Sequence, residues 1–80
     1  MKATVLVRPK DGILDPQGEA VEGSLRKLGF TVEQVRVGRL IDVEVAASGT
    51  DDARRQLERM CAELLTNPLI ESYEIRLEGG

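Results

Sequence analysis

The stretch Ile13–Gly18 marks the boundary between an extended segment and a helix, and it constrains the fold more than any other part of the chain. Asp15 is a good N-cap, because its carboxylate accepts hydrogen bonds from backbone N–H groups that the first helical turn leaves free. Pro16 follows at the first helical position, where its fixed φ suits a helix. Gly18 then lies on the apolar side, where the lack of a side chain allows close backbone contact. The stretch fixes the angle at which the helix follows the extended segment and the distance at which the helix packs. It contains no residue with an obvious catalytic role.

The hydrophobic pattern around this boundary predicts four strands and two helices. Apolar residues alternate or run continuously in the four strand segments, which are Lys2–Arg8, Thr31–Val37, Leu40–Ala47 and Glu71–Leu77. They recur at helical spacing from Pro16 to Leu28, and again between a predicted cap at Thr50 and the terminator Asn67-Pro68. Gly29 is placed to end the first helix in a left-handed conformation. Gly38 and Arg39 leave room only for a tight turn, so the strands on either side of them should form a hairpin.

This element order, β-α-β-β-α-β, predicts a single domain over residues 1–80 with an α+β, ferredoxin-like fold. In that plan a four-stranded antiparallel sheet carries both helices on one face, as a two-layer sandwich. The first and third strands are central. Their core positions are expected to be Val5, Val7, Ile41 and Val43.

The opposite face of the sheet is then the natural place for another protein. Leu6 and Leu40 should point there. Eighty residues with one Phe, one Tyr and no Trp offer only a thin core. A chain of this size buries only about 60–65% of the surface that its unfolded form exposes. A second copy closing the outer face is therefore expected to add stability.

Composition disfavours nucleic-acid and membrane partners. The formal net charge is −3, and the chain lacks the aromatic residues that stack on bases. No charged and apolar leader opens the sequence, and no apolar run reaches membrane length. The single Cys excludes an intramolecular disulfide and is typical of a reducing compartment. We therefore expect a cytoplasmic protein.

Residues for catalysis or metal binding are scarce. The absence of His removes the usual general base and the commonest metal ligand. Cys61 lies on the apolar stripe of the second helix, which predicts a buried structural thiol. Asp42 and Glu44 share one strand face, which is typical of a solvated surface. No Gly-rich phosphate loop precedes a helix. We expect no catalytic, cofactor-binding or metal-binding residue on this chain.

Three segments, Ile13–Gly18, Val35–Arg39 and Leu65–Tyr73, together resemble the PurS family, in the family's order and at compatible spacings. PurS is the small subunit of phosphoribosylformylglycinamidine synthase. The resemblance implies a role in purine biosynthesis, where the complex converts formylglycinamide ribonucleotide, glutamine and ATP into formylglycinamidine ribonucleotide, glutamate, ADP and phosphate. It implies a non-catalytic subunit that bridges the glutaminase PurQ and the synthetase PurL and assists ammonia transfer. ATP and Mg²⁺ would bind the synthetase, and this chain would form a homo-oligomer.

We expect the contacts with partner subunits at the positions of these motifs. The residues are Asp15, Pro16, Gln17, Gly18, Arg36, Gly38, Arg39, Asn67 and Pro68. Each is also explained by local turn chemistry. A second interpretation is a regulatory module of the ACT kind, which has the same element order and binds amino acids as a dimer. Asp11-Gly12 only poorly matches the glycine-rich ligand turn of that class.

Overall fold

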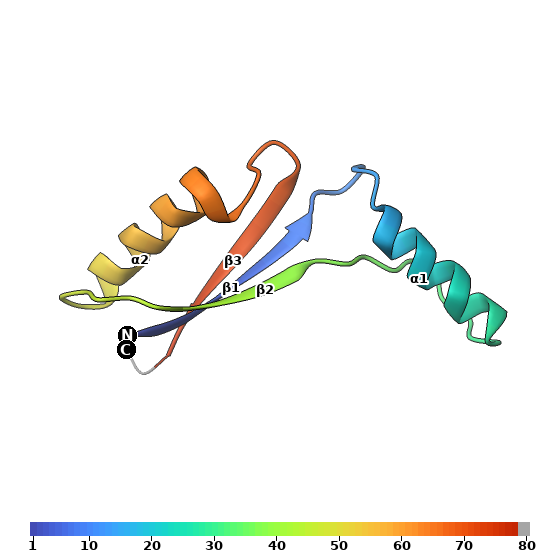
Figure 1. Ribbon diagram of the computed structural model, residues 1–80, viewed down its shortest axis with the longest axis horizontal. Helices are drawn as coiled ribbons and strands as arrows, with labels where there is room; N and C mark the ends of the chain where they lie inside the picture. Colours follow the sequence, from blue (N-terminus) through green and yellow to red (C-terminus); the bar gives the residue numbers. More distant parts are fainter. Residues whose placement is uncertain (79–80) are drawn as a thin grey trace.

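The computed structural model describes residues 1–78 and shows an elongated α+β molecule of 50 × 26 × 14 Å (Figure 1). In chain order the elements are β1 (Lys2–Pro9), α1 (Pro16–Lys27), β2 (Arg39–Glu44), α2 (Thr50–Met60), the π-helical turn η1 (Cys61–Leu65) and β3 (Glu71–Leu77). Neither α1 nor α2 is long and apolar enough to cross a membrane, as judged over the part of the chain that the structure describes.

β1 is the central strand of the sheet, with β2 and β3 antiparallel on either side. Val5 lies opposite both Ile41 and Ile75, and Leu6 lies opposite Leu40. Directly opposed residues share a face of a sheet. The predicted parity is therefore confirmed: Val5 and Ile41 face the core, while Leu6 and Leu40 face away from it.

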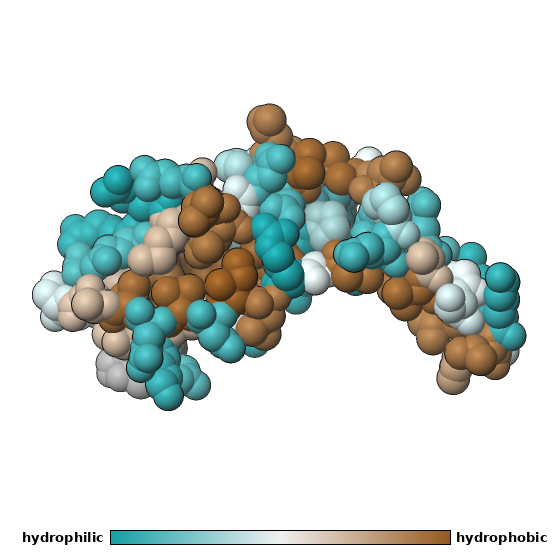
Figure 2. Space-filling view, viewed as in Figure 1, coloured by the Kyte–Doolittle hydropathy of each residue, from teal (hydrophilic) through white to brown (hydrophobic). Residues whose placement is uncertain are grey.

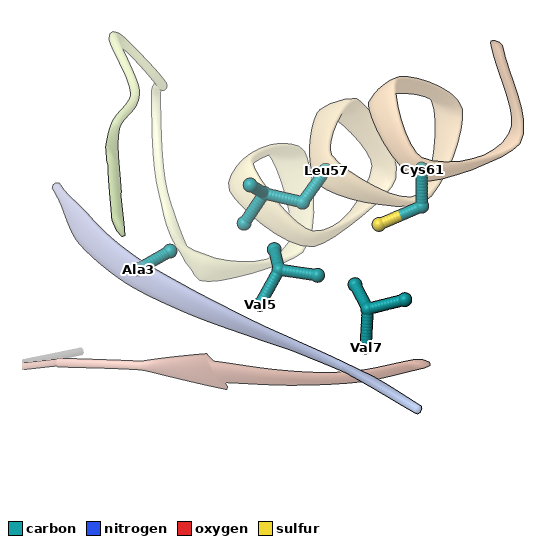
Figure 3. Packing of buried hydrophobic residues seen from close by; sticks show 5 residues of the cluster. All are labelled: Ala3, Val5, Val7, Leu57 and Cys61. Atoms are coloured by element: carbon teal, nitrogen blue, oxygen red, sulfur yellow. The ribbon is translucent and has the colours of Figure 1, made fainter. Parts of the chain in front are cut away.

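The core lies between the sheet and α2. Leu57 and Cys61 project from the helical segment onto the β1 side chains Ala3, Val5 and Val7, as Figure 3 shows. Leu57 and Cys61 are fully buried, and burial raises the pKa of the Cys61 thiol. The prediction of a structural thiol is confirmed. Residues of β2 and β3, such as Ile41 and Ile75, pack around this cluster and are only half-buried.

The predicted strand Thr31–Val37 and its hairpin are wrong. Within residues 1–78 the sheet has three strands, so the predicted fourth strand is wrong, whereas the predicted α+β class with two helices and an antiparallel sheet is confirmed. After a turn at Leu28 and Gly29 the chain reverses direction, and residues 30–38 lead into β2 with a bend at Glu33 and no turn at Gly38 (Figure 1). A side chain at Gly38 would collide with the carbonyl of Val7. The glycine therefore serves close approach to β1 rather than a reversal of the chain.

The predicted position of both helices on one face is wrong for α1. This helix lies beyond the end of the sheet, and α2 alone covers the core face (Figure 1). The apolar side of α1 is consequently open to solvent, with Val21 41% and Leu28 74% exposed. Gly29 ends the helix with a φ of 98°, as predicted.

The ends of the second helical segment also differ from expectation. Gly49 occupies the cap position in place of Thr50, and it makes no side-chain cap bond. At the other end α2 widens into η1 before the chain reaches Asn67. Thr66 Oγ1 donates to the carbonyl of Cys61 at 2.9 Å, which supports this wider turn.

Candidate functional site

Three segments that are distant in sequence meet where β1 ends and α1 begins. These are residues 9–18, 35–39 and 65–71, and we call the place where they meet the corner. A hollow of about 380 Å³ opens there, lined by residues from all three segments, among them Leu14, Val37, Arg39 and Ile70. The motifs singled out in the sequence thus lie together in space.

Asp15 joins the first segment to the second. Its Oδ1 accepts a hydrogen bond from the Gly18 N–H at 3.0 Å, which confirms the predicted cap. Its Oδ2 accepts from the Val37 N–H at 2.9 Å, a bond across 22 positions of the chain. These donors, Val37 first, favour the charged carboxylate and lower the pKa of Asp15 below its ordinary value of 3.8. Because this bond uses the Val37 N–H, that group is not available to a neighbouring strand.

Gly18 explains why the two segments lie so close. It is the buried residue of α1, and a side chain there would collide with Asp15 Oδ2 and with the carbonyl of Val35. The predicted packing role of this glycine is confirmed, and its partner is the extended segment that leads into β2.

Arg36 also ties the extended segment to the end of β1. Its Nη1 lies 2.6 Å from Asp11 Oδ1, and its Nη2 donates to the carbonyl of Pro9. The Arg36 side chain is 27% exposed. Asp15 and Arg36 together tie residues 35–37 to the start of α1 and to the end of β1.

Arg39 organises the third segment. Its Nη1 pairs with Glu71 Oε2 at 2.5 Å, and its Nη2 donates to the Leu65 carbonyl at the end of η1. Glu71 Oε1 in turn accepts from the Asn67 N–H at 2.7 Å. Arg39, followed by the Asn67 N–H, lowers the pKa of Glu71 below its ordinary value of 4.5.

Asn67 and Pro68 shape the turn that leads into β3. Asn67 Oδ1 accepts from the Leu69 N–H at 3.2 Å, and the Asn67 carbonyl accepts from Glu71. Lys10 donates through Nζ to the Pro68 carbonyl at 2.7 Å and through its N–H to the Ile70 carbonyl at 2.8 Å. The turn is thereby fixed to the end of β1.

The family model described as PurS, phosphoribosylformylglycinamidine (FGAM) synthase, matches residues 2–79. The chain belongs to the PurS family. The resemblance read from the three motifs is confirmed, and the ACT-like interpretation is not favoured.

Individual PurS proteins agree with this assignment. The PurS subunit of Methanocaldococcus jannaschii is 37% identical over 78 residues, which are 96% of this chain and 94% of that protein. Its crystal structure matches with a TM-score of 0.81, covering 94% of this chain and 92% of that chain. The structure of PurLQS from Thermotoga maritima contains a chain that is 37% identical, with a TM-score of 0.86 and coverage of 94% and 93%.

All nine predicted PurS motif residues lie at the corner. Pro16 and Gln17 line the hollow beside Asp15, Gly38 and Arg39. Arg36, Asn67 and Pro68 are bonded within its walls, and Gly18 lies against Asp15.

Sequence reasoning missed two residues of the corner, Glu71 and Lys10. Glu71 lies within the motif segment Leu65–Tyr73 but was not named as a contact residue, and the only signal for Lys10 was its position after Pro9. Among residues 1–78, no group of three or more His, Cys, Asp or Glu residues is arranged to hold a metal ion. What the corner offers chemically is a fixed surface, whose charged groups are bonded to one another.

Proposed function

We propose that this chain is the small, non-catalytic subunit of phosphoribosylformylglycinamidine synthase and acts in de novo purine biosynthesis in the cytoplasm. The observation that carries the proposal is the match to PurS subunits over nearly the full chain, including the chain in the PurLQS structure. The complex would convert formylglycinamide ribonucleotide, glutamine and ATP into formylglycinamidine ribonucleotide, glutamate, ADP and phosphate. ATP and Mg²⁺ would bind the synthetase subunit.

The chain would bridge the glutaminase PurQ and the synthetase PurL and assist the passage of ammonia. Ammonia released into water at neutral pH is protonated and lost as a nucleophile. A bridging subunit that excludes water at the junction protects it. This task needs a fixed surface and no reactive group, and the corner supplies such a surface through the bonds of Asp15, Arg36 and Arg39.

The same proposal places the partner contacts at the corner. Its nine motif residues come from three segments, and the structure brings them together. Several of them, such as Pro16 and Pro68, are exposed although they are held by a bonded framework. A preorganised surface binds with less loss of conformational entropy than a mobile one.

A homo-oligomer is part of the proposal, and α1 with the turn that follows it supplies its surface. Leu28 is 74% and Phe30 58% exposed, and burying a large apolar side chain contributes about 1.5–3 kcal/mol. Among the described residues, the backbone N–H groups of residues 31–36 donate no hydrogen bond. The Val32 carbonyl accepts from Arg26 Nη2, while the N–H groups of the segment are free within residues 1–78. Free backbone donors are a template for pairing with another chain, so a second copy would cover both the helix and the segment.

The outer face of the sheet is less suited to that role than the sequence suggests. Leu6 and Leu40 are its apolar members, and the positions paired around them are polar or charged, as for Thr4, Asp42 and Glu74. The apolar surface left open by the fold lies mainly on α1 and at the corner.

Complex formation tests the proposal. The purified chain is mixed with PurL and PurQ subunits from the same organism and separated by size-exclusion chromatography with light scattering. We expect one species whose mass contains all three subunits. Elution of this chain apart from both partners, at concentrations where PurL and PurQ are folded and active, would count against the assignment.

A further inference from the structure

Asp11-Gly12 is the one place in the chain where an Asp or Asn residue is followed by Gly. Such a dipeptide is prone to cyclise within the chain, because Gly has no side chain to shield its backbone nitrogen. The remaining Asp and Asn residues precede either Pro, which has no N–H, or a residue with a side chain. The three PurS motif segments do not include Asp11-Gly12, so they give it no role.

The dipeptide forms the tip of the connection between β1 and α1. The Ile13 N–H donates to the Lys10 carbonyl at 3.2 Å, so Asp11 and Gly12 are the central residues of a tight turn. Gly12 has a φ of 83°, and a side chain there would meet no neighbouring atom. The connection runs along the upper side of the molecule, between the sheet and α1 (Figure 1), and Figure 2 shows this region at the surface. Water therefore reaches both residues.

The two groups that would react with one another are accessible and weakly held. The Asp11 side chain is 99% exposed, and its Oδ1 lies 2.6 Å from Arg36 Nη1. The Gly12 N–H donates no hydrogen bond within residues 1–78. Ring closure requires the Gly12 nitrogen to turn toward the Asp11 side chain, and the open space around Gly12 allows this rotation. An exposed ion pair opens readily, so Arg36 slows the reaction without preventing it.

The reaction needs no reagent other than water. In the protonated form of the Asp11 carboxyl group, the Gly12 nitrogen attacks Cγ. The N–Cγ bond forms, the bond from Cγ to the hydroxyl oxygen breaks, and the hydroxyl group leaves with the amide hydrogen as water. Water then opens the resulting succinimide at either carbonyl. Cleavage of the N–Cγ bond restores aspartate, whereas cleavage of the original peptide bond leaves Gly12 attached through Cγ, as isoaspartate.

We propose that Asp11-Gly12 is a site of spontaneous isoaspartate formation, and that the ion pair with Arg36 slows the reaction by holding the carboxyl group away from the Gly12 nitrogen. Isoaspartate lengthens the backbone between β1 and α1 and attaches the carboxylate directly to Cα, which shortens its reach. The Arg36–Asp11 tie to the end of β1 is then lost. The enzymes that recognise such a product are isoaspartyl methyltransferases, which methylate its free α-carboxylate.

The test ages the purified chain for several weeks at neutral pH and physiological temperature. An isoaspartyl methyltransferase with labelled S-adenosylmethionine measures total isoaspartate, and electron-transfer fragmentation in a mass spectrometer locates the modified residue. Asp11→Glu is the matched control, because it keeps the charge opposite Arg36 but would have to close a larger ring. We expect isoaspartate to accumulate at residue 11 of the natural chain, with only background labelling of Asp11→Glu.

The role of Arg36 is tested in the same assay. Arg36→Gln should raise the rate of isoaspartate formation by about two- to fivefold, as the loss of an exposed ion pair allows. High salt, which screens the pair, should act in the same direction on the natural chain, and it replaces the variant if circular dichroism shows that Arg36→Gln unfolds. A rate unchanged in the folded variant, or by salt where the variant unfolds, would overturn the role of the pair.

A synthetic peptide of residues 7–16 is the positive control for the chemistry. Isoaspartate in the peptide but none at residue 11 of the folded chain would overturn the proposed site, and so would equal labelling of the natural chain and Asp11→Glu. Neither result depends on PurL or PurQ, so the inference stands or falls separately from the proposed function.

Discussion

Leu57→Ala tests whether the α2 to β1 contact carries the stability of this small chain. Leu57 is fully buried against Val5 and Val7, in a core with few other large side chains. The change removes three carbons, worth about 2.4 kcal/mol at roughly 0.8 kcal/mol each, and leaves a cavity that raises the loss to about 2–5 kcal/mol. An 80-residue chain has a free energy of unfolding of only about 4–12 kcal/mol, so the variant should lose a large part of its stability.

Urea unfolding followed by circular dichroism measures this loss, at one fixed protein concentration because association shifts the midpoint. A 3 kcal/mol loss corresponds to a fall in Tm of about 12–24 °C. Leu64→Ala is the control, since Leu64 is 83% exposed and its change should stay within about 0.5 kcal/mol. Equal, small losses in the two variants would refute the placement of the core between α2 and β1.

Three further predictions concern the corner and α1. Gly18→Ala should destabilise the chain by about 1–3 kcal/mol, because the added methyl group would collide with Asp15 and Val35. Gly23→Ala has open space around it and should stabilise the chain by about 0.5–1 kcal/mol. Urea unfolding of both variants should show changes of opposite sign in the free energy of unfolding. The pKa values of Asp15 and Glu71 are lowered in the folded chain. Their contribution to the free energy of unfolding is therefore full above the ordinary values of 3.8 and 4.5, and it is lost as the pH falls below these values. The urea midpoint should therefore drop between pH 5 and pH 3, and a flat profile would speak against these bonds. Leu28→Asp, at the C-cap of α1, should lower the oligomer mass measured by light scattering without loss of the helical circular dichroism signal. An unchanged mass would show that α1 does not form the contact between copies.

Local rules predicted most of the individual elements, with the strand Thr31–Val37 and the cap at Thr50 as the exceptions. The cap at Asp15, the stop at Gly29 and the alternation along β1 depend on neighbours in the sequence, and the structure shows all three. The inward and outward parity of Val5 and Leu6 likewise follows from the period of a strand.

The arrangement of the elements in space was harder to predict, because it depends on contacts between segments that are distant in sequence. Gly38 signals either a tight turn or close approach of two backbones, and only the carbonyl of Val7 decides between them. The bond from Val37 to Asp15 spans 22 positions, and no periodicity reveals it. The same holds for the candidate site: the motifs marked its residues, but the pairing of Arg39 with Glu71 required the fold.

Turnover of the reconstituted complex tests the central claim most directly. Purified PurL and PurQ are assayed for formylglycinamidine ribonucleotide formation, with and without this chain, using either glutamine or ammonium chloride as the nitrogen source. A bridging subunit predicts that glutamine-dependent turnover requires the chain, while turnover with ammonium by PurL alone does not. Equally fast glutamine-dependent turnover without the chain would contradict it.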